Sequence, residues 1–141
     1  MSAIQLAALA RTTEPQSVLR RFLALDAAVT GANALAYLAF SGPLGRFLGV
    51  GSGLLLGVGA FLALYVAGVA LVAGRRRPPA AGVRAVVEGN AAWTVLSLAA
   101  LALWLSPSTA GAVWTVVQAV SVAGFAALQH LALKACQDTD S

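Results

Sequence analysis

The run FLALDAAVTGANALAYLAF at residues 22–40 is apolar apart from a few isolated polar side chains, of which Asp26 is the one carboxylic acid. A hydrocarbon core about 30 Å thick is crossed by about 20 helical residues, so this run predicts a membrane-spanning helix. Three further apolar runs follow, at residues 47–74, 85–105 and 110–133. The glycine-rich beginning of the second run predicts an interfacial turn, with its helix starting near Ser52. The sequence therefore predicts an all-α integral membrane protein, a four-helix bundle.

The composition of the 141-residue chain excludes an ordinary soluble domain. Hydrophobic residues make up 60% and charged residues 10% of the chain, whereas soluble domains have roughly 25% charged residues. The mean hydropathy is +0.84. The net charge of +4 would suit a nucleic-acid binder, but the basic residues lie between the apolar runs rather than along one polar face. We therefore expect membrane lipids around the protein and no nucleic-acid partner.

Disulfides, metals and cofactors are not expected. The single cysteine, Cys136, permits no intrachain disulfide and no CxxC motif. His130 is the one histidine, and one histidine cannot build a metal site or a bis-histidine haem site with the ligands available. Nucleotide-binding glycine patterns and hydrolase motifs are absent from the sequence as well.

The connections between the apolar runs predict both topology and orientation. Short turns at residues 41–43 and 106–108 and an arginine-rich connection at 74–79 indicate an up-down-up-down order. The side with both termini carries eight basic residues, and the other side carries Arg46 alone. The positive-inside rule therefore places both termini on the cytoplasmic side of the cell (inner) membrane. The arginine triplet is interpreted as a lipid-phosphate contact, with a partner-binding site as the alternative. The eight basic residues are Arg11, Arg20, Arg21, Arg75, Arg76, Arg77, Arg84 and Lys134.

The expected organisation is one transmembrane domain between two short cytoplasmic segments. The N-terminal segment covers residues 1–18, the transmembrane domain residues 19–135 and the C-terminal tail residues 136–141. The N-terminal segment lacks the charged, apolar and small-residue regions of a signal peptide in the right order, so we expect it to be retained.

An internal repeat is also expected. Displacing the chain by 64 residues aligns two hairpin-sized halves that run in the same direction, so the repeat axis would lie along the membrane normal. This differs from the inverted repeats of many transporters. The matches that carry the argument are Arg20 with Arg84, Asp26 with Asn90, Thr30 with Thr94, Pro43 with Pro107 and Phe61 with Phe125.

Polar side chains follow helical spacing in three of the four runs. Because hydrocarbon cannot satisfy them, these stripes should face one another inside the bundle or across a subunit contact in a homo-oligomer. For each neutral group two roles stay open, a helix–helix contact and a binding site. The stripes are Asp26, Thr30, Asn33 and Tyr37; Asn90, Thr94 and Ser97, with Trp93 beside them; and Trp114, Gln118, Ser121, Phe125 and Gln129, with Tyr65 as the repeat-mate of Gln129.

Two acids are candidate catalytic residues. Asp26 lies a turn and a half past Arg21, just inside the expected hydrocarbon boundary, and is a candidate general acid. Its structural alternative is a bond to Asn90 or a pair with a nearby arginine. Glu88 would be a second acid if it turned inward, whereas an interfacial pair with Arg84 is its alternative role.

The pattern RFLALDAAVTGANALAYL, followed by an SGP turn, an arginine-rich loop and EGNAAW, resembles the small four-span integral membrane proteins of high-GC actinobacteria, a largely uncharacterised group. The resemblance covers the chain from Leu19 to Leu133. It implies the fold and the membrane location, and it supplies no catalytic residue.

Three functions are considered. The first is binding of a lipophilic small molecule, such as an isoprenoid or polyketide, or its cofactor-independent isomerisation, cyclisation or epoxide opening by Asp26. The second is a non-enzymatic structural or accessory membrane subunit, and the third is a small oligomeric transporter. A cavity of several hundred Å³ opening on Asp26 favours the first function, and a solid bundle favours the second. The expected pocket is lined by Thr30, Asn33, Tyr37, Tyr65, Asn90, Trp93 and Gln118.

Overall fold

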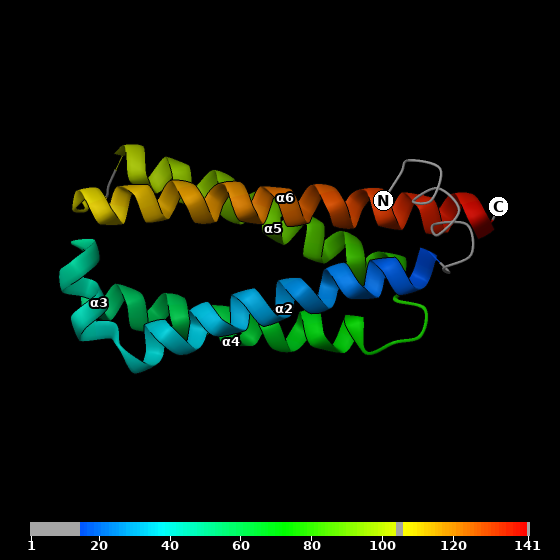
Figure 1. The fold of residues 1–141 in the computed structure, drawn as a ribbon, viewed down its shortest axis with the longest axis horizontal. Helices are drawn as coiled ribbons and strands as arrows, with labels where there is room; N and C mark the ends of the chain where they lie inside the picture. Colours follow the sequence, from blue (N-terminus) through cyan, green and yellow to red (C-terminus); the bar gives the residue numbers. More distant parts are fainter. Residues whose placement is uncertain (1–14, 104–105, 141) are drawn as a thin grey trace, which may run out of the picture.

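The computed structural model describes residues 15–103 and 106–140, which form five helices. Four of them are long and apolar enough to cross a membrane, and they alternate in direction as the connections predict (Figure 1). The all-α four-helix bundle is thus confirmed. Most of the predicted N-terminal segment, residues 1–14, lies outside the described residues. The helices are α2 (Pro15–Ala39), α3 (Ser41–Leu48), α4 (Ser52–Ala73), α5 (Ala80–Leu103) and α6 (Thr109–Asp140).

The boundaries differ from the prediction at three places. Residues 41–43 do not form a simple turn but begin the short helix α3, which tolerates Pro43 because the first N–H groups of a helix have no partner within it. Helix α2 begins seven residues before its apolar run, and α6 continues seven residues beyond its own. Hydropathy reports where a chain meets lipid, and a helix can continue past that point into water. Helix α4 begins at Ser52, as predicted.

The four long helices pack as two hairpins that meet unequally. Helix α2 packs along α4, and α5 packs along α6. Helix α2 also contacts α6, whereas α4 and α5 barely touch each other. Figure 1 shows the two hairpins converging at the end that holds the α4–α5 connection and separating toward α3. We call these the termini end and the α3 end of the bundle.

The buried apolar residues reflect this arrangement, a wedge in which the hairpins are close at the termini end and apart at the α3 end. At the termini end, one core cluster draws on all four long helices. At the α3 end, the buried cluster draws on α2 and α4 alone, with other helices adding partly buried neighbours such as Trp93. The hairpins are therefore held together mainly in one half of the bundle. The first cluster contains Leu19, Leu23, Val69, Val83, Val86, Ala132, Leu133 and Cys136, and the second contains Ala34, Tyr37, Leu55 and Leu62.

At the α3 end, α3 bridges the two hairpins. The Ser108 N–H donates to the Leu48 carbonyl at 3.1 Å, and the Ser108 hydroxyl donates to the Phe47 carbonyl at 2.7 Å. Gly49 ends α3 with φ of +72°, a left-handed conformation that favours glycine. A Cβ at Gly49 would also collide with the Ser108 backbone. The hydrogen bonds between α3 and Ser108 therefore connect the two hairpins at the end where they are farthest apart.

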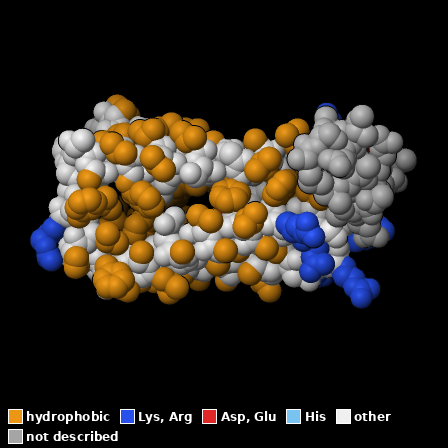
Figure 2. All heavy atoms as spheres, viewed as in Figure 1, with side chains coloured by type: hydrophobic (Ala, Val, Ile, Leu, Met, Phe, Trp, Pro, Cys, Tyr) orange, Lys and Arg blue, Asp and Glu red, His pale blue; other side chains and the backbone are white. Residues whose placement is uncertain are grey.

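The surface matches a lipid environment along its length and water at its ends. Large apolar side chains such as Leu35, Leu64 and Leu71 are more than two-thirds exposed. Figure 2 shows apolar side chains over the middle of the molecule and basic side chains at its ends. At the termini end, the Arg20 Nε donates to the Ala73 carbonyl at 3.0 Å, which satisfies a backbone acceptor in the last turn of α4.

Candidate functional site

A buried polar core joins three of the four long helices. Asp26 on α2, Asn90 on α5 and Gln129 on α6 are each at most 3% exposed. The Asn90 Nδ2 donates to Asp26 Oδ2 at 2.8 Å and to Gln129 Oε1 at 3.0 Å. The Gln129 Nε2 donates to the same Asp26 oxygen at 2.8 Å. The polar stripes of the sequence thus face one another inside the bundle.

Two hydroxyl groups extend the polar core. The Thr30 hydroxyl donates to Asp26 Oδ1 at 3.0 Å, and the Tyr65 hydroxyl of α4 lies 3.1 Å from Asn90 Oδ1 and 2.8 Å from the Val86 carbonyl oxygen. Gly89 permits the approach of Tyr65, because a Cβ there would lie 3.0 Å from the tyrosine ring. Asp26 therefore accepts three hydrogen bonds through its two oxygens.

The polar core has the spacing of the expected repeat. Asp26 and Asn90 are 64 residues apart and bonded to each other. Asp26 bonds Gln129, and their repeat-mates Asn90 and Tyr65 lie at hydrogen-bond distance as well. The threonines differ, because Thr94 donates to the backbone oxygens of Asn90 and Ala119 rather than to a side chain. The duplication stays a prediction, to be tested by superposing the two hairpins at this displacement.

Two adjoining cavities lie between the hairpins on the α3 side of the polar core. Their volumes are about 160 Å³ and 260 Å³, and both are lined by Trp93, Leu96 and Gln118. All four long helices contribute to the walls, which are mostly apolar. We call these two cavities the chamber. Its position follows from the separation of the hairpins, because the buried core of the α3 half comes from α2 and α4.

Every residue of the expected pocket lines the chamber. The structure brings Thr30, Asn33, Tyr65, Asn90, Trp93 and Gln118 to the first cavity and Tyr37 to the second; their role in binding stays a prediction. The two candidate acids lie elsewhere. Asp26 is 1% exposed and lines neither cavity, and Glu88 lies on an exposed face of α5 in a separate recess. Two hydrogen-bond partners of Asp26, Thr30 and Asn90, line the chamber, whereas Asp26 itself does not.

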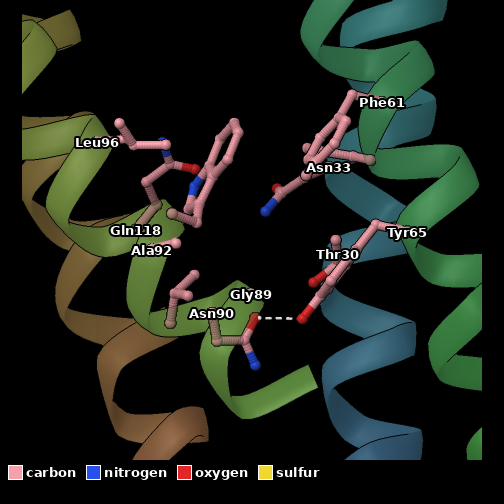
Figure 3. A pocket seen from close by; sticks show the side chains of 12 residues that line it. Thr30, Asn33, Phe61, Tyr65, Gly89, Asn90, Ala92, Leu96 and Gln118 are labelled. Carbon is pink, nitrogen blue, oxygen red and sulfur yellow. Dashed lines mark hydrogen bonds between the residues drawn. The ribbon is translucent and has the colours of Figure 1, made fainter. Parts of the chain in front are cut away.

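Polar groups with spare hydrogen-bonding capacity line the chamber. The amides of Asn33 and Gln118 make no hydrogen bond to another described residue, and Figure 3 shows the Asn33 amide pointing into the cavity. The Tyr37 hydroxyl accepts a bond from Trp114 Nε1 at 2.7 Å, which leaves its own proton for another acceptor. The two amides can both donate to and accept from a ligand, and the Tyr37 hydroxyl can donate to it.

Aromatic rings form the wall between α4 and α5. Phe61 stacks on Tyr65 with ring centres 6.4 Å apart and on Trp93 with ring centres 6.0 Å apart. Phe61 is 54% exposed, so this stack reaches the outer surface of the bundle. Since α4 and α5 have few other contacts, side chains rather than packed backbones separate the chamber from the bilayer on this side.

Sequence reasoning left three residues of the polar core and the chamber out of the expected pocket. Gln129 and Trp114 stand in the polar stripe of the fourth run, so their helical spacing was the available signal. Phe61 precedes Tyr65 by one helical turn, and nothing in its spacing distinguishes it from the lipid-facing residues around it. Its role depends on Trp93, which lies on another hairpin.

Among the described residues, no group of three or more histidine, cysteine or acidic side chains could hold a metal ion. No protein-family model, curated protein or solved structure matches the chain.

Proposed function

We propose that this membrane protein binds a lipophilic small molecule in the chamber, with one polar group of the ligand held by Asn33, Gln118 and Tyr37. The observation that supports this most directly is the pair of amides in mostly apolar walls without partners among the described residues. An unsatisfied polar group away from water costs about 1–3 kcal/mol. The Asn33 and Gln118 side chains are half-buried, so a ligand that bonds their amides recovers part of that free energy and fills the space between the hairpins.

The ligand enters sideways from the bilayer, between α4 and α5. These helices have few contacts with each other, and the wall between them contains the exposed ring of Phe61. Side-chain rotation can open such a wall without moving a helix. A molecule with an apolar chain and one polar group, such as an isoprenoid alcohol, would leave its chain among the apolar walls.

Binding is better supported than acid catalysis. A general acid must reach the reacting atom with its own proton, whereas both Asp26 oxygens accept bonds inside the polar core. This core fits the structural alternative considered for Asp26, a bond to Asn90. We therefore assign the polar core to holding the hairpins together and the chamber to the ligand.

Farnesol and its hydrocarbon counterpart farnesene provide the test. We expect farnesol to raise the unfolding temperature of the purified protein in detergent by several degrees, because a ligand of the folded state stabilises it. Farnesene has a similar chain and no hydroxyl group, so it should have a much smaller effect. Equal shifts for both compounds would contradict a polar anchor in the chamber.

We also propose that both termini lie on the cytoplasmic side of the cell (inner) membrane, and that the arginine-rich connection at residues 74–79 lies on the same side. With Cys136 replaced by serine, a cysteine introduced by Arg76→Cys should react with a membrane-impermeant maleimide in inverted vesicles and be protected in intact cells. The matched variant Arg46→Cys at the α3 end should show the opposite pattern. Reaction of the Arg76→Cys protein in intact cells alone would reverse the orientation.

A further inference from the structure

A second recess lies on the outside of the α5–α6 hairpin, at the termini end. Its volume is about 470 Å³, and four ionisable side chains line it: Arg84 and Glu88 from α5, and His130 and Lys134 from α6. In each helix the two residues are four apart and therefore share one face. The floor contains Val87 and the buried Leu133.

The four side chains form two layers at different depths. Helices α5 and α6 are antiparallel and are in register where Asn90 donates to Gln129. Arg84 comes six residues before Asn90, and Lys134 comes five residues after Gln129. Both lie about 8 Å closer to the termini end than the polar core, at a rise of about 1.5 Å per residue. Glu88 and His130 form the deeper layer, nearly level with the polar core.

The shallower layer coincides with the edge of the hydrocarbon. From Arg84 to Leu103, helix α5 rises by about 28 Å, which matches a hydrocarbon core about 30 Å thick. Leu103 is 71% exposed at the other edge. In a bilayer placed in this way, Arg84 and Lys134 lie at the hydrocarbon edge, within side-chain reach of the lipid phosphates, and the apolar floor of the recess lies behind them.

We propose that this recess binds the phosphate group of an anionic phospholipid. Arg84 and Lys134 bracket the phosphate from two helices, and charge complementarity identifies the occupant. The two basic residues outnumber the one acidic residue of the recess, Glu88, which opposes the phosphate from the deeper layer. The His130 imidazole lies at the depth of Glu88 and can donate a hydrogen bond to the Glu88 carboxyl group or to a lipid ester carbonyl. The acyl chains then lie along Val87 and its neighbours. The inference requires the membrane location and does not depend on a ligand in the chamber.

Native mass spectrometry of the delipidated protein tests the proposal. The probes are phosphatidylglycerol and phosphatidylcholine with identical acyl chains. We expect the wild-type protein to retain phosphatidylglycerol preferentially, and Arg84→Gln/Lys134→Gln to reduce its retention by about tenfold or more, since each basic residue near a membrane surface contributes measurably to anionic lipid binding. Glu88→Gln removes the opposing charge and should increase retention.

The matched control is Arg75→Gln/Arg77→Gln, which removes two positive charges from the connection outside the recess. Because this connection is itself interpreted as a lipid-phosphate contact, the control should lose some phosphatidylglycerol, but clearly less than Arg84→Gln/Lys134→Gln, which removes both charges from one site. Equal losses in the two double variants, or equal retention of both lipids by the wild type, would overturn the proposal. Retention of inorganic phosphate alone, dependent on Arg84 and Lys134, would overturn the assignment to a lipid. Circular dichroism of each variant separates these outcomes from unfolding.

Discussion

Replacing Asn90 by aspartate is expected to lower the free energy of unfolding in detergent by about 3 kcal/mol. The new carboxylate would lie at the position from which Asn90 Nδ2 now donates to Asp26 Oδ2 at 2.8 Å. Two carboxylates at this distance repel each other, and both sites are at most 3% exposed. A buried polar group left without its hydrogen-bond partner costs about 1–3 kcal/mol, more when the group is charged, and repulsion acts in the same direction.

The second substitution Asp26→Asn should recover most of this loss. In Asp26→Asn/Asn90→Asp, the amide and the carboxylate exchange places across the helix pair. The new carboxylate can accept from the asparagine at 26 and from the Tyr65 hydroxyl, which now lies 3.1 Å from Asn90 Oδ1. A double-mutant cycle of chemical or thermal unfolding measures the coupling between the two positions. Absence of recovery would show that the two positions are not coupled through this hydrogen bond.

A matched control separates repulsion from simple burial of charge. Asn33→Asp adds the same charge in the same helix as Asp26, about 10 Å farther along it. Asp26→Asn should not rescue this variant, because the two side chains share no hydrogen bond. Rescue of Asn33→Asp to the same extent, or wild-type stability of Asn90→Asp alone, would show that the polar core is not arranged as described.

The membrane character and the polar interior could be predicted because both depend on local sequence. Apolar length predicts spanning helices, and the helical spacing of Asp26, Thr30, Asn33 and Tyr37 predicts one shared face. Because hydrocarbon offers no hydrogen-bond partner, this polar face is also predicted to point into the bundle. The same logic brought seven residues from four helices to one chamber.

What the sequence did not reveal is the unequal packing of the hairpins. Helices α2 and α6 contact each other, whereas α5 and α4, which the expected repeat would match to them, barely do. This asymmetry depends on distances between hairpins, to which hydropathy and periodicity are insensitive. Because of this unequal packing, Asp26 is enclosed by its hydrogen-bond partners, whereas Asn90 and Tyr65 line the chamber. The catalytic role of Asp26 stays a prediction, and its bond to Asn90 is the structural alternative that the sequence also offered.

Filling the chamber should abolish the binding that we propose for it. Ala92 lines the first cavity, whose volume is about 160 Å³, and it is exposed to that space rather than packed in the core. In Ala92→Phe, a phenyl ring would occupy much of the cavity beside Trp93. We expect the stabilisation by farnesol to disappear, which corresponds to a loss of affinity of about tenfold or more, since one decade is about 1.4 kcal/mol.

Ala91→Phe provides the matched control for this variant. It adds the same ring one residue earlier, about 100° around α5, at an exposed position that lines neither cavity. Its unfolding temperature should rise with farnesol as in the wild type, and neither variant disturbs the hydrogen bonds of the polar core. Titration of farnesol followed by thermal unfolding gives both values in one experiment. If both variants lose the farnesol effect, or neither does, the ligand does not occupy the chamber between the hairpins.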